Sequence, residues 1–272
     1  MHGDDKNLPA SMFATALMYH ALAQGDAPAG QDPHYTLALD AFTGQLDCMQ
    51  RDAQGAGCTR DWLAGTYAGK VLLTFDDGHA SNFRMAFPAL VERGMRADFF
   101  VNPAIVGAPG FATWAELREM AEAGMSIQSH GHDHVYLTTL DERRLRHTLK
   151  AARDDIEQHV GTPVTLLAPP GGRMPVNLVE VARECGYSHV LSSRPGRIAR
   201  VGTTVSATPL PRMAVIASLD VDTLQAWISG DPKAVQREQL RYATLAWAKR
   251  LLGDARYEQV RTRAIAFRRG RA

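Results

Sequence analysis

The sequence has no run of about 18 apolar residues, the length that a helix needs to cross a membrane. Its opening residues, MHGDDKN, lack the basic and then apolar order of a secretory signal. These absences predict a soluble cytoplasmic protein that touches a membrane at most at its periphery. An exported protein is the alternative if a signal segment has been trimmed from the chain.

Cysteines are also scarce. The three of them, Cys48, Cys58 and Cys185, are odd in number and show no CxxC spacing. This argues against a disulfide framework and against a zinc site built from cysteines.

Short apolar runs alternate with stretches of helical period along most of the chain. The predicted strands are Met12–His20, Lys70–Phe75, Ala97–Asn102, Met125–Ser129, Val164–Ala168 and His189–Ser192. The predicted helices are Ala41–Gln54, Asn82–Arg93, Thr113–Ala123, Asp141–His159 and Pro175–Cys185. This alternation implies a parallel sheet with crossover helices. Six or seven such units in 272 residues favour a single-domain α/β barrel over an open sheet.

Two adjacent carboxylates follow the second predicted strand, which ends in Thr74-Phe75-Asp76-Asp77-Gly78. In a barrel, functional side chains gather where strands end. Neighbouring acids repel each other unless a cation lies beside them. An Asp pair after a strand is also common as a turn or helix cap, so the pair alone leaves both interpretations open.

Histidines follow the fourth predicted strand in the same way. His130 and His134 are one helical turn apart and can face one point, whereas His132 between them points away. Two imidazoles, one carboxylate and an open water position make a catalytic rather than a structural metal site. A solvated loop is the alternative, but the two motifs at separate strand ends together favour the metal site.

With these motifs the chain resembles the polysaccharide deacetylases, also called the NodB homology or family 4 carbohydrate esterase group. The resemblance spans roughly Leu17 to Val215. The family motif TFDDG stands intact at Thr74–Gly78, and its second motif, two histidines four positions apart, stands at His130 and His134. The resemblance implies a distorted (β/α) barrel with seven strands.

The same resemblance implies an activity, the hydrolysis of the acetamide of an N-acetylated amino sugar. It assigns a metal, usually zinc with Co²⁺, Ni²⁺ or Mn²⁺ as alternatives, to Asp77, His130 and His134. A divalent metal polarises the amide carbonyl and acidifies water, and Asp76 would take the proton of that water. A backbone N–H of the third motif, at Pro170, Gly171 and Gly172, is expected to stabilise the oxyanion.

An acid must protonate the leaving amine, and the candidate is His20. Tyr19-His20 is similar to an N-terminal pair that supplies the acid in the biofilm poly-N-acetylglucosamine deacetylase branch. The pattern from Tyr35 to Phe42 resembles that branch as well. The alternative is a partly buried histidine whose ring is satisfied by backbone.

The chain departs from the family pattern in its third and later motifs. Ala168 replaces the arginine that normally orients the base, and we hypothesise that Arg212 takes this role. The late Asp-Trp and Leu-x-His motifs are also missing; the His20 assignment accounts for the second of these losses. Asn102 is expected to line the sugar site, with Trp114 as a stacking platform or, alternatively, as a core residue at a helix start.

The charge is uneven. Residues 233–272 carry eleven Lys and Arg against three Asp and Glu. Because the whole chain has a net charge of +1, the remaining residues carry a net charge of about −7. With its leucines and Trp247, the tail at 231–272 predicts a basic amphipathic helix after a barrel at 1–230. Such a helix packs on its domain or binds anionic lipid, a lipid-linked sugar or a membrane glycosyltransferase. Because basic residues cluster only there, we expect no nucleic-acid partner.

Two rival functions remain open from the sequence. The same residues could release another acyl group, as a deformylase or amidase acting on a lipid-linked sugar or a non-sugar amide. Alternatively, the missing motifs could mark a catalytically silent barrel that binds saccharide. The favoured prediction is a zinc-dependent N-deacetylase of an exopolysaccharide or its precursor.

Overall fold

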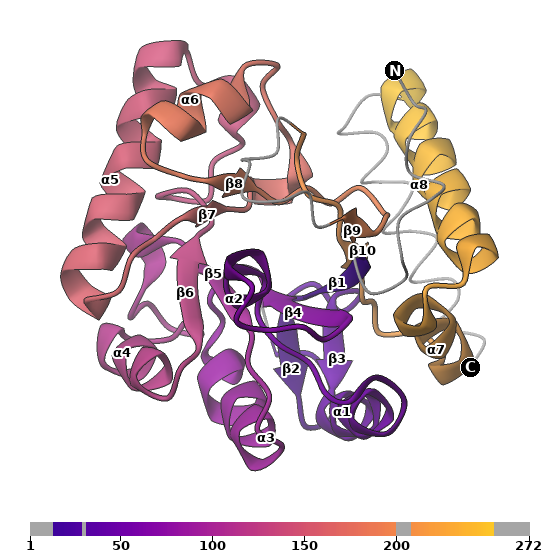
Figure 1. Cartoon of the computed structure of the whole chain (residues 1–272). Helices are drawn as coiled ribbons and strands as arrows, with labels where there is room; N and C mark the ends of the chain where they lie inside the picture. The colour runs from indigo at the N-terminus through magenta and orange to yellow at the C-terminus, as the bar shows by residue number, and fades with distance from the viewer. Residues whose placement is uncertain (1–12, 29–30, 200–207, 253–272) are drawn as a thin grey trace.

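The computed structural model describes residues 13–28, 31–199 and 208–252, with side chains up to residue 247. Its centre is a curled sheet whose parallel strands run in the order β10-β1-β4-β5-β6-β7-β8 (Figure 1). These strands are β1 (Phe13–Tyr19), β4 (Val71–Phe75), β5 (Asp98–Val101), β6 (Ser126–Ser129), β7 (Leu166–Leu167), β8 (His189–Val190) and β10 (Met213–Ala214). In addition, β9 (Ile198–Ala199) runs antiparallel beside β1, and β2 (Ala21–Ala23) pairs with β3 (Thr36–Ala38).

Helices surround this sheet (Figure 1). They are α1 (Leu39–Ala53), α2 (Thr59–Ala64), α3 (Phe87–Glu92), α4 (Trp114–Glu122), α5 (Glu142–Val160), α6 (Leu178–Glu184), α7 (Val221–Ser229) and α8 (Pro232–Leu252). A π-helical turn, η3 (Asn82–Ala86), precedes α3, and short 3-10 turns occur at η4 (Pro103–Ile105), η5 (Leu137–Thr139) and η6 (Pro170–Gly172). Local sequence sets several ends: Thr113 forms a capping box with Glu116 at α4, and Asp141 caps α5.

The two edges of the curled sheet meet at one point. Leu191, directly after β8, forms an isolated bridge with Leu210, which shortly precedes β10. Because β10 pairs with β1, this bridge brings the two edges together without a continuous ladder. The predicted single-domain distorted (β/α) barrel is confirmed, as a barrel that is incompletely closed. Every predicted strand and helix overlaps an observed one, whereas α2, α7 and the strands β2, β3 and β9 were not predicted.

Alternation along the strands decides which side chains face the barrel interior. Leu72 of β4 and Phe100 of β5 pack in the interior cluster, whereas Leu73 and Phe75 pack toward the helices. Side chains two residues apart share a face of a strand. Asp76 therefore continues the inward row of Leu72 at the end of β4.

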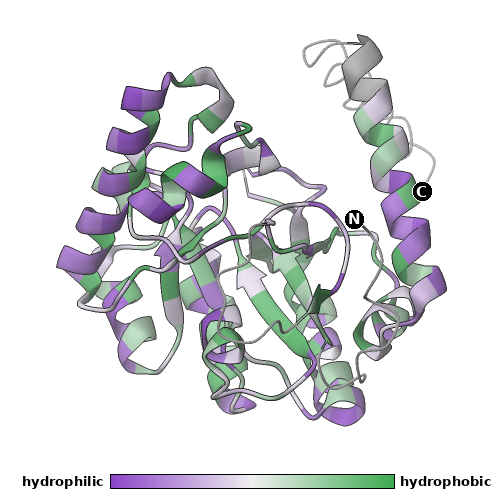
Figure 2. Ribbon diagram, turned by 45° about the horizontal axis from the view of Figure 1, so that its top comes forward, coloured by the Kyte–Doolittle hydropathy of each residue, from purple (hydrophilic) through white to green (hydrophobic). Residues whose placement is uncertain are grey.

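The predicted tail contains the helix α8, and residues 253–272 lie outside the described part of the chain. The prediction of one apolar face is wrong for the described side chains of α8. Val235 is buried on one side, while Leu240 and Trp247 are exposed on another, and Figure 2 shows hydrophobic and hydrophilic residues mixed along the helix. A domain boundary at residue 230 stays a prediction. Among the described helices, none combines the length and the apolar character that crossing a membrane requires.

Candidate active site

Asp76 is buried at the end of β4 and forms a two-pronged ion pair with Arg212. The Nη1 and Nη2 atoms of Arg212 donate to Oδ1 and Oδ2 of Asp76 at 2.6 and 2.8 Å. Arg212 is itself fully buried, and it also donates to Thr74 Oγ1 at 3.2 Å and to the Ser192 carbonyl at 3.1 Å. Burial alone would raise the pKa of Asp76, but the Arg212 guanidinium, together with His130 and His20, holds the pKa below its ordinary value. The carboxylate is thus ionised and fixed in orientation.

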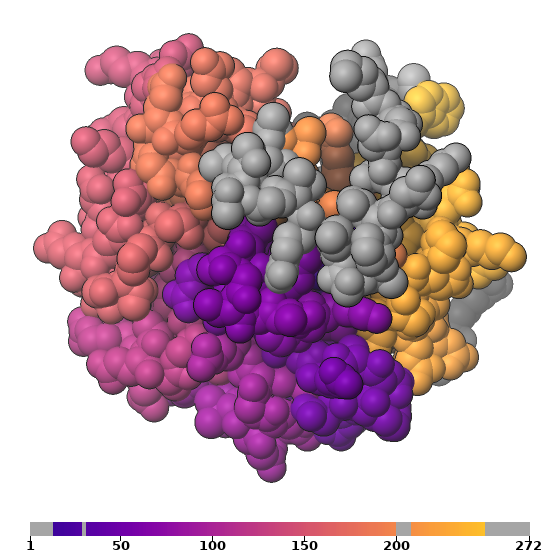
Figure 3. All heavy atoms as spheres, in the orientation of Figure 1, coloured from indigo at the N-terminus to yellow at the C-terminus, as the bar shows by residue number. Residues whose placement is uncertain are grey.

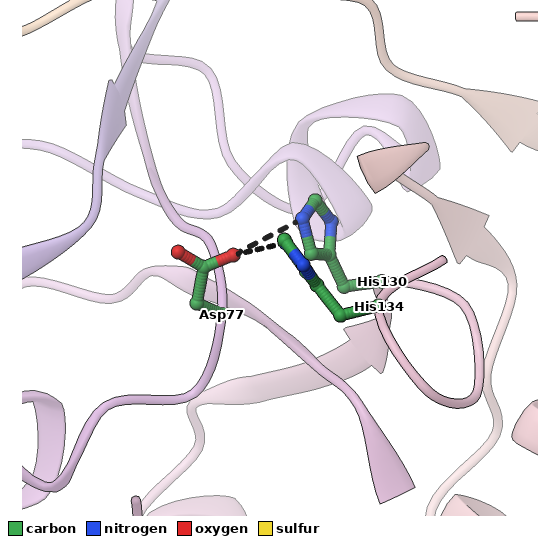
Figure 4. A group of neighbouring side chains, drawn as sticks. All are labelled: Asp77, His130 and His134. Carbon is green, nitrogen blue, oxygen red and sulfur yellow. Dashed lines mark ion pairs between the residues drawn. The ribbon is translucent and has the colours of Figure 1, made fainter. Parts of the chain in front are cut away.

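The three predicted metal ligands converge on one point (Figure 4). Oδ1 of Asp77 lies 3.2 Å from Nε2 of His130 and 3.1 Å from Nε2 of His134. One ligand atom from each residue can be chosen so that all three lie within 4.8 Å of one another. Burial would raise the pKa of Asp77, but hydrogen bonds from His130, His134 and His79 outweigh it and hold the pKa well below its usual range. One carboxylate and two imidazoles fit a catalytic zinc site, which leaves a position open.

Two of these three residues have strained backbones. Asp77 has φ of 75° and His134 has φ of 58°, and Gln54 is the third non-glycine residue with positive φ in the described ranges. Such conformations cost about 1–3 kcal/mol each and concentrate at functional sites. The fold therefore holds both ligands in unfavourable conformations that aim their side chains at each other.

Asn102, predicted to line the sugar site, instead supports the histidine loop. It is fully buried after β5, and its Nδ2 donates to the carbonyls of His130 at 2.5 Å and Gly131 at 3.4 Å. Trp114 stacks on His159, with ring centroids 4.3 Å apart, where α4 and α5 pack together. Neither residue is among those lining the cavity described below, so a sugar-binding role for Asn102 and Trp114 stays a prediction.

His20 follows β1 and lines the same cavity as the metal ligands. Its ring packs against Tyr35, with centroids 4.7 Å apart, and its buried Nδ1 has no hydrogen-bond partner in the described residues. Burial lowers the pKa of His20, while the carboxylates of Asp77 and Asp76 act in the opposite direction. The Nδ1 atom of His20 is thus not satisfied by backbone within the described residues, which favours the acid over the alternative of a structural histidine.

A cavity of about 420 Å³ opens over these groups. Its size lies in the range of small-ligand sites, roughly 300–1,000 Å³. Gly171 and Gly172 of the third motif line it, whereas Pro170 is buried and does not. Proline has no N–H, and the Gly172 N–H donates to the Pro169 carbonyl at 3.0 Å. Among the three predicted oxyanion residues, Gly171 is therefore the one whose N–H best suits donation to an oxyanion.

Several lining residues were not predicted from the sequence. His79 places Nε2 3.4 Å from Oδ2 of Asp77, and its position directly after TFDDG is a signal that could have identified it. Tyr136 and Arg173 also line the cavity and contact each other, with the Arg173 guanidinium carbon 4.1 Å from the ring centroid of Tyr136. Residues from α8 complete the lining. No local motif marks them.

Comparison with known proteins agrees with this geometry. The sequence model of the family described as "Polysaccharide deacetylase" matches residues 65–190. YxkH of Bacillus subtilis (strain 168), which is named for the same family, is 30% identical over 130 residues, or 48% of this chain and 47% of YxkH. The chain thus spans about half the length of this curated relative.

Two solved structures share the fold. BC0361, a polysaccharide deacetylase from Bacillus cereus, has a TM-score of 0.71 at 21% identity, covering 79% of this chain and 69% of its own. IcaB from Ammonifex degensii has a TM-score of 0.62 at 26% identity, covering 84% of this chain and 97% of its own. Residues 65–190, which carry both the paired carboxylates and the two histidines, match the sequence model of the polysaccharide deacetylase family over slightly less than half of this chain.

Proposed function

We propose that this protein is a metal-dependent N-deacetylase that hydrolyses the acetamide of an N-acetylated amino sugar in a saccharide. The observation that carries the proposal is the convergence of Asp77, His130 and His134 beside a second carboxylate, Asp76, in one cavity. The match to the polysaccharide deacetylase model supports an acetylated saccharide as substrate. The resemblance of Tyr19-His20 to the poly-N-acetylglucosamine branch favours such a chain or its precursor.

A bound divalent cation, zinc by preference, would polarise the amide carbonyl and make water more acidic. Asp76 would accept the proton of the attacking water, for which it must be ionised and aimed at the cavity. The Arg212 ion pair supplies both conditions, because it lowers the pKa of Asp76 and fixes both carboxylate oxygens. A protein that only held a metal would not need this second, oriented carboxylate.

Two further groups would act on the organic part of the reaction. The Gly171 N–H would donate to the oxyanion that forms on the amide oxygen. His20 would give a proton to the leaving amine. Because burial lowers the pKa of His20, a protonated His20 is a stronger acid than an ordinary histidine. The leaving amine is a stronger base than the His20 ring. Proton transfer in this direction is therefore favourable.

Acetate release tests the proposal. Zinc-loaded wild type is incubated with β-1,4- and β-1,6-linked N-acetylglucosamine oligomers, and Asp76→Asn is compared with the exposed control Asp154→Asn. We expect Asp76→Asn to lose acetate release by about 10²–10⁴-fold, the usual contribution of a general base, and to keep its zinc. The control should match wild type.

Because Asp76→Asn leaves Arg212 without its carboxylate, the double variant Asp76→Asn/Arg212→Gln guards against misfolding. It should be inactive with a thermal midpoint near that of wild type.

Release of formate from formylated sugars without acetate from any oligomer would favour the deformylase. Saccharide binding without any acyl release would favour the silent barrel, and either result would reject the proposal.

A further inference from the structure

One face of α8 forms a wall of the cavity that holds the metal ligands. The residues of α8 that line this cavity are Glu238, Arg241, Tyr242, Leu245 and Ala246. Their spacing of three and four residues places them on a single stripe of the helix. A helix far along the sequence from the TFDDG and histidine motifs thus contributes a continuous surface to their cavity.

The N-terminal half of α8 is anchored to the barrel. Ala234 and Val235 are buried, with Ala234 in the main core, and the Gln239 side chain donates to the Pro195 carbonyl at 3.2 Å. Figure 3 shows α8 on the flank of the molecule opposite α5 and α6. This anchoring fixes the cavity-facing stripe relative to the site.

The stripe is polar at its first turn. Glu238 accepts hydrogen bonds from Arg241 on both carboxylate oxygens, with Nε of Arg241 at 3.0 Å from Oε1 and 2.8 Å from Oε2. The Glu238 side chain is only 11% exposed, against 46% for Arg241. A paired carboxylate and guanidinium provide hydrogen-bond acceptors and donors without a net charge. Sugar hydroxyls can pair with both, because each hydroxyl is a donor and an acceptor. The adjacent Tyr242 adds an aromatic ring on which the C–H face of a sugar can pack.

We propose that this stripe of α8 binds a sugar unit next to the one that reacts, so that α8 gives the enzyme its preference for a saccharide chain over a single amino sugar. The chemistry favours uncharged sugar units, because the guanidinium of Arg241 is already neutralised by Glu238. This inference rests on the proposed deacetylase function.

Steady-state kinetics on the zinc-loaded full chain test the inference, with N-acetylglucosamine and its hexamers as probes. We expect Arg241→Ala and Tyr242→Ala each to raise KM for a hexamer about tenfold with kcat within about twofold, because one lost polar or aromatic contact is worth about 1.4 kcal/mol. Both variants should process the monomer as wild type does. Arg237→Ala is the matched control, since Arg237 lies on the same helix, is exposed and does not line the cavity.

Three outcomes would overturn the inference. Unchanged hexamer kinetics in both α8 variants would show that the stripe does not contact the chain. An equal loss on monomer and hexamer would show a structural effect on the whole site. Failure of wild type to release acetate from any probe would reject the proposed function itself, and with it the inference. The assay of wild type alone distinguishes this outcome from the other two.

Discussion

A single buried guanidinium, Arg212, fixes the carboxylate proposed as the general base. The pair is isolated from solvent, and the remaining Arg212 donors reach Thr74 and the Ser192 carbonyl, so the charge is neutralised and hydrogen-bonded. Breaking such a pair from one side typically costs about 3–5 kcal/mol because the other charge stays buried. Arg212 thus acts on Asp76 in two ways, by charge and by geometry.

These two contributions are separable with Arg212→Lys, which keeps the charge but removes the planar fork. We expect turnover to fall about 10- to 100-fold while zinc content stays within about twofold, because the metal ligands are untouched. Acetate release and metal analysis on the same samples measure both. The neighbouring exposed Arg194→Lys is the control, and unchanged turnover in Arg212→Lys would remove the positioning role.

At the scale of elements, the turn η6 brings backbone close to the reacting groups. Gly171 has φ of 61°, and a Cβ there would lie 2.7 Å from Cε1 of Tyr136. Only glycine adopts this conformation without strain and leaves room for the ring. The turn therefore combines a backbone donor with close packing against Tyr136, which also lines the cavity.

Gly171→Ala should reduce both stability and turnover, because the added methyl meets Tyr136 and shifts the Gly171 N–H. Gly161→Ala is the matched control: its φ of 78° is equally unfavourable for alanine, but a Cβ there meets nothing within 4 Å and α5 ends outside the cavity. We expect both variants to lose about 1 kcal/mol of unfolding free energy through the positive φ, and Gly171→Ala to lose more because of its contact with Tyr136. Only Gly171→Ala should lose more than about tenfold in acetate release, and an equal loss in both would contradict the role of the turn.

At the scale of the whole molecule, the proposed metal ties together the ends of strands that are not neighbours. Asp77 follows β4, both histidines follow β6, and β5 lies between them. A cation bound there would link the carboxyl ends of β4 and β6 across β5. The bound cation would also replace the hydrogen bonds that these three side chains make to one another.

Removal of the metal should therefore destabilise the fold. At zinc concentrations about 100-fold above the dissociation constant, binding adds about 2.7 kcal/mol, which corresponds to roughly 5–10 °C in the thermal midpoint of a chain of this size. Differential scanning calorimetry with and without chelator measures this shift, and added zinc should restore the midpoint. His134→Ala should respond weakly to either treatment. A chelator shift of the same size in that variant would argue that the metal binds elsewhere.

Local sequence was enough for the main strands and helices and for the three residues that converge as candidate metal ligands. The carboxyl ends of parallel strands lie at the same mouth of a barrel. The proximity of Asp77 and His130 could therefore be predicted without the conformation of any loop. It was not enough for side chains whose neighbours are set by packing. Trp114 had the right residue type for a sugar platform, but the start of α4 turns its ring toward His159 on α5.

The barrel and the convergence of its motif residues could thus be inferred from the sequence, because the period of each strand is local and parallel strands with crossover helices end at one mouth. The contact of Arg212 with Asp76 across 136 positions of sequence, and the place of one face of α8 in the cavity wall, follow from the packed structure alone. Both depend on how distant segments pack around the barrel mouth. Such packing follows from the summed burial of many side chains and leaves no local pattern to read.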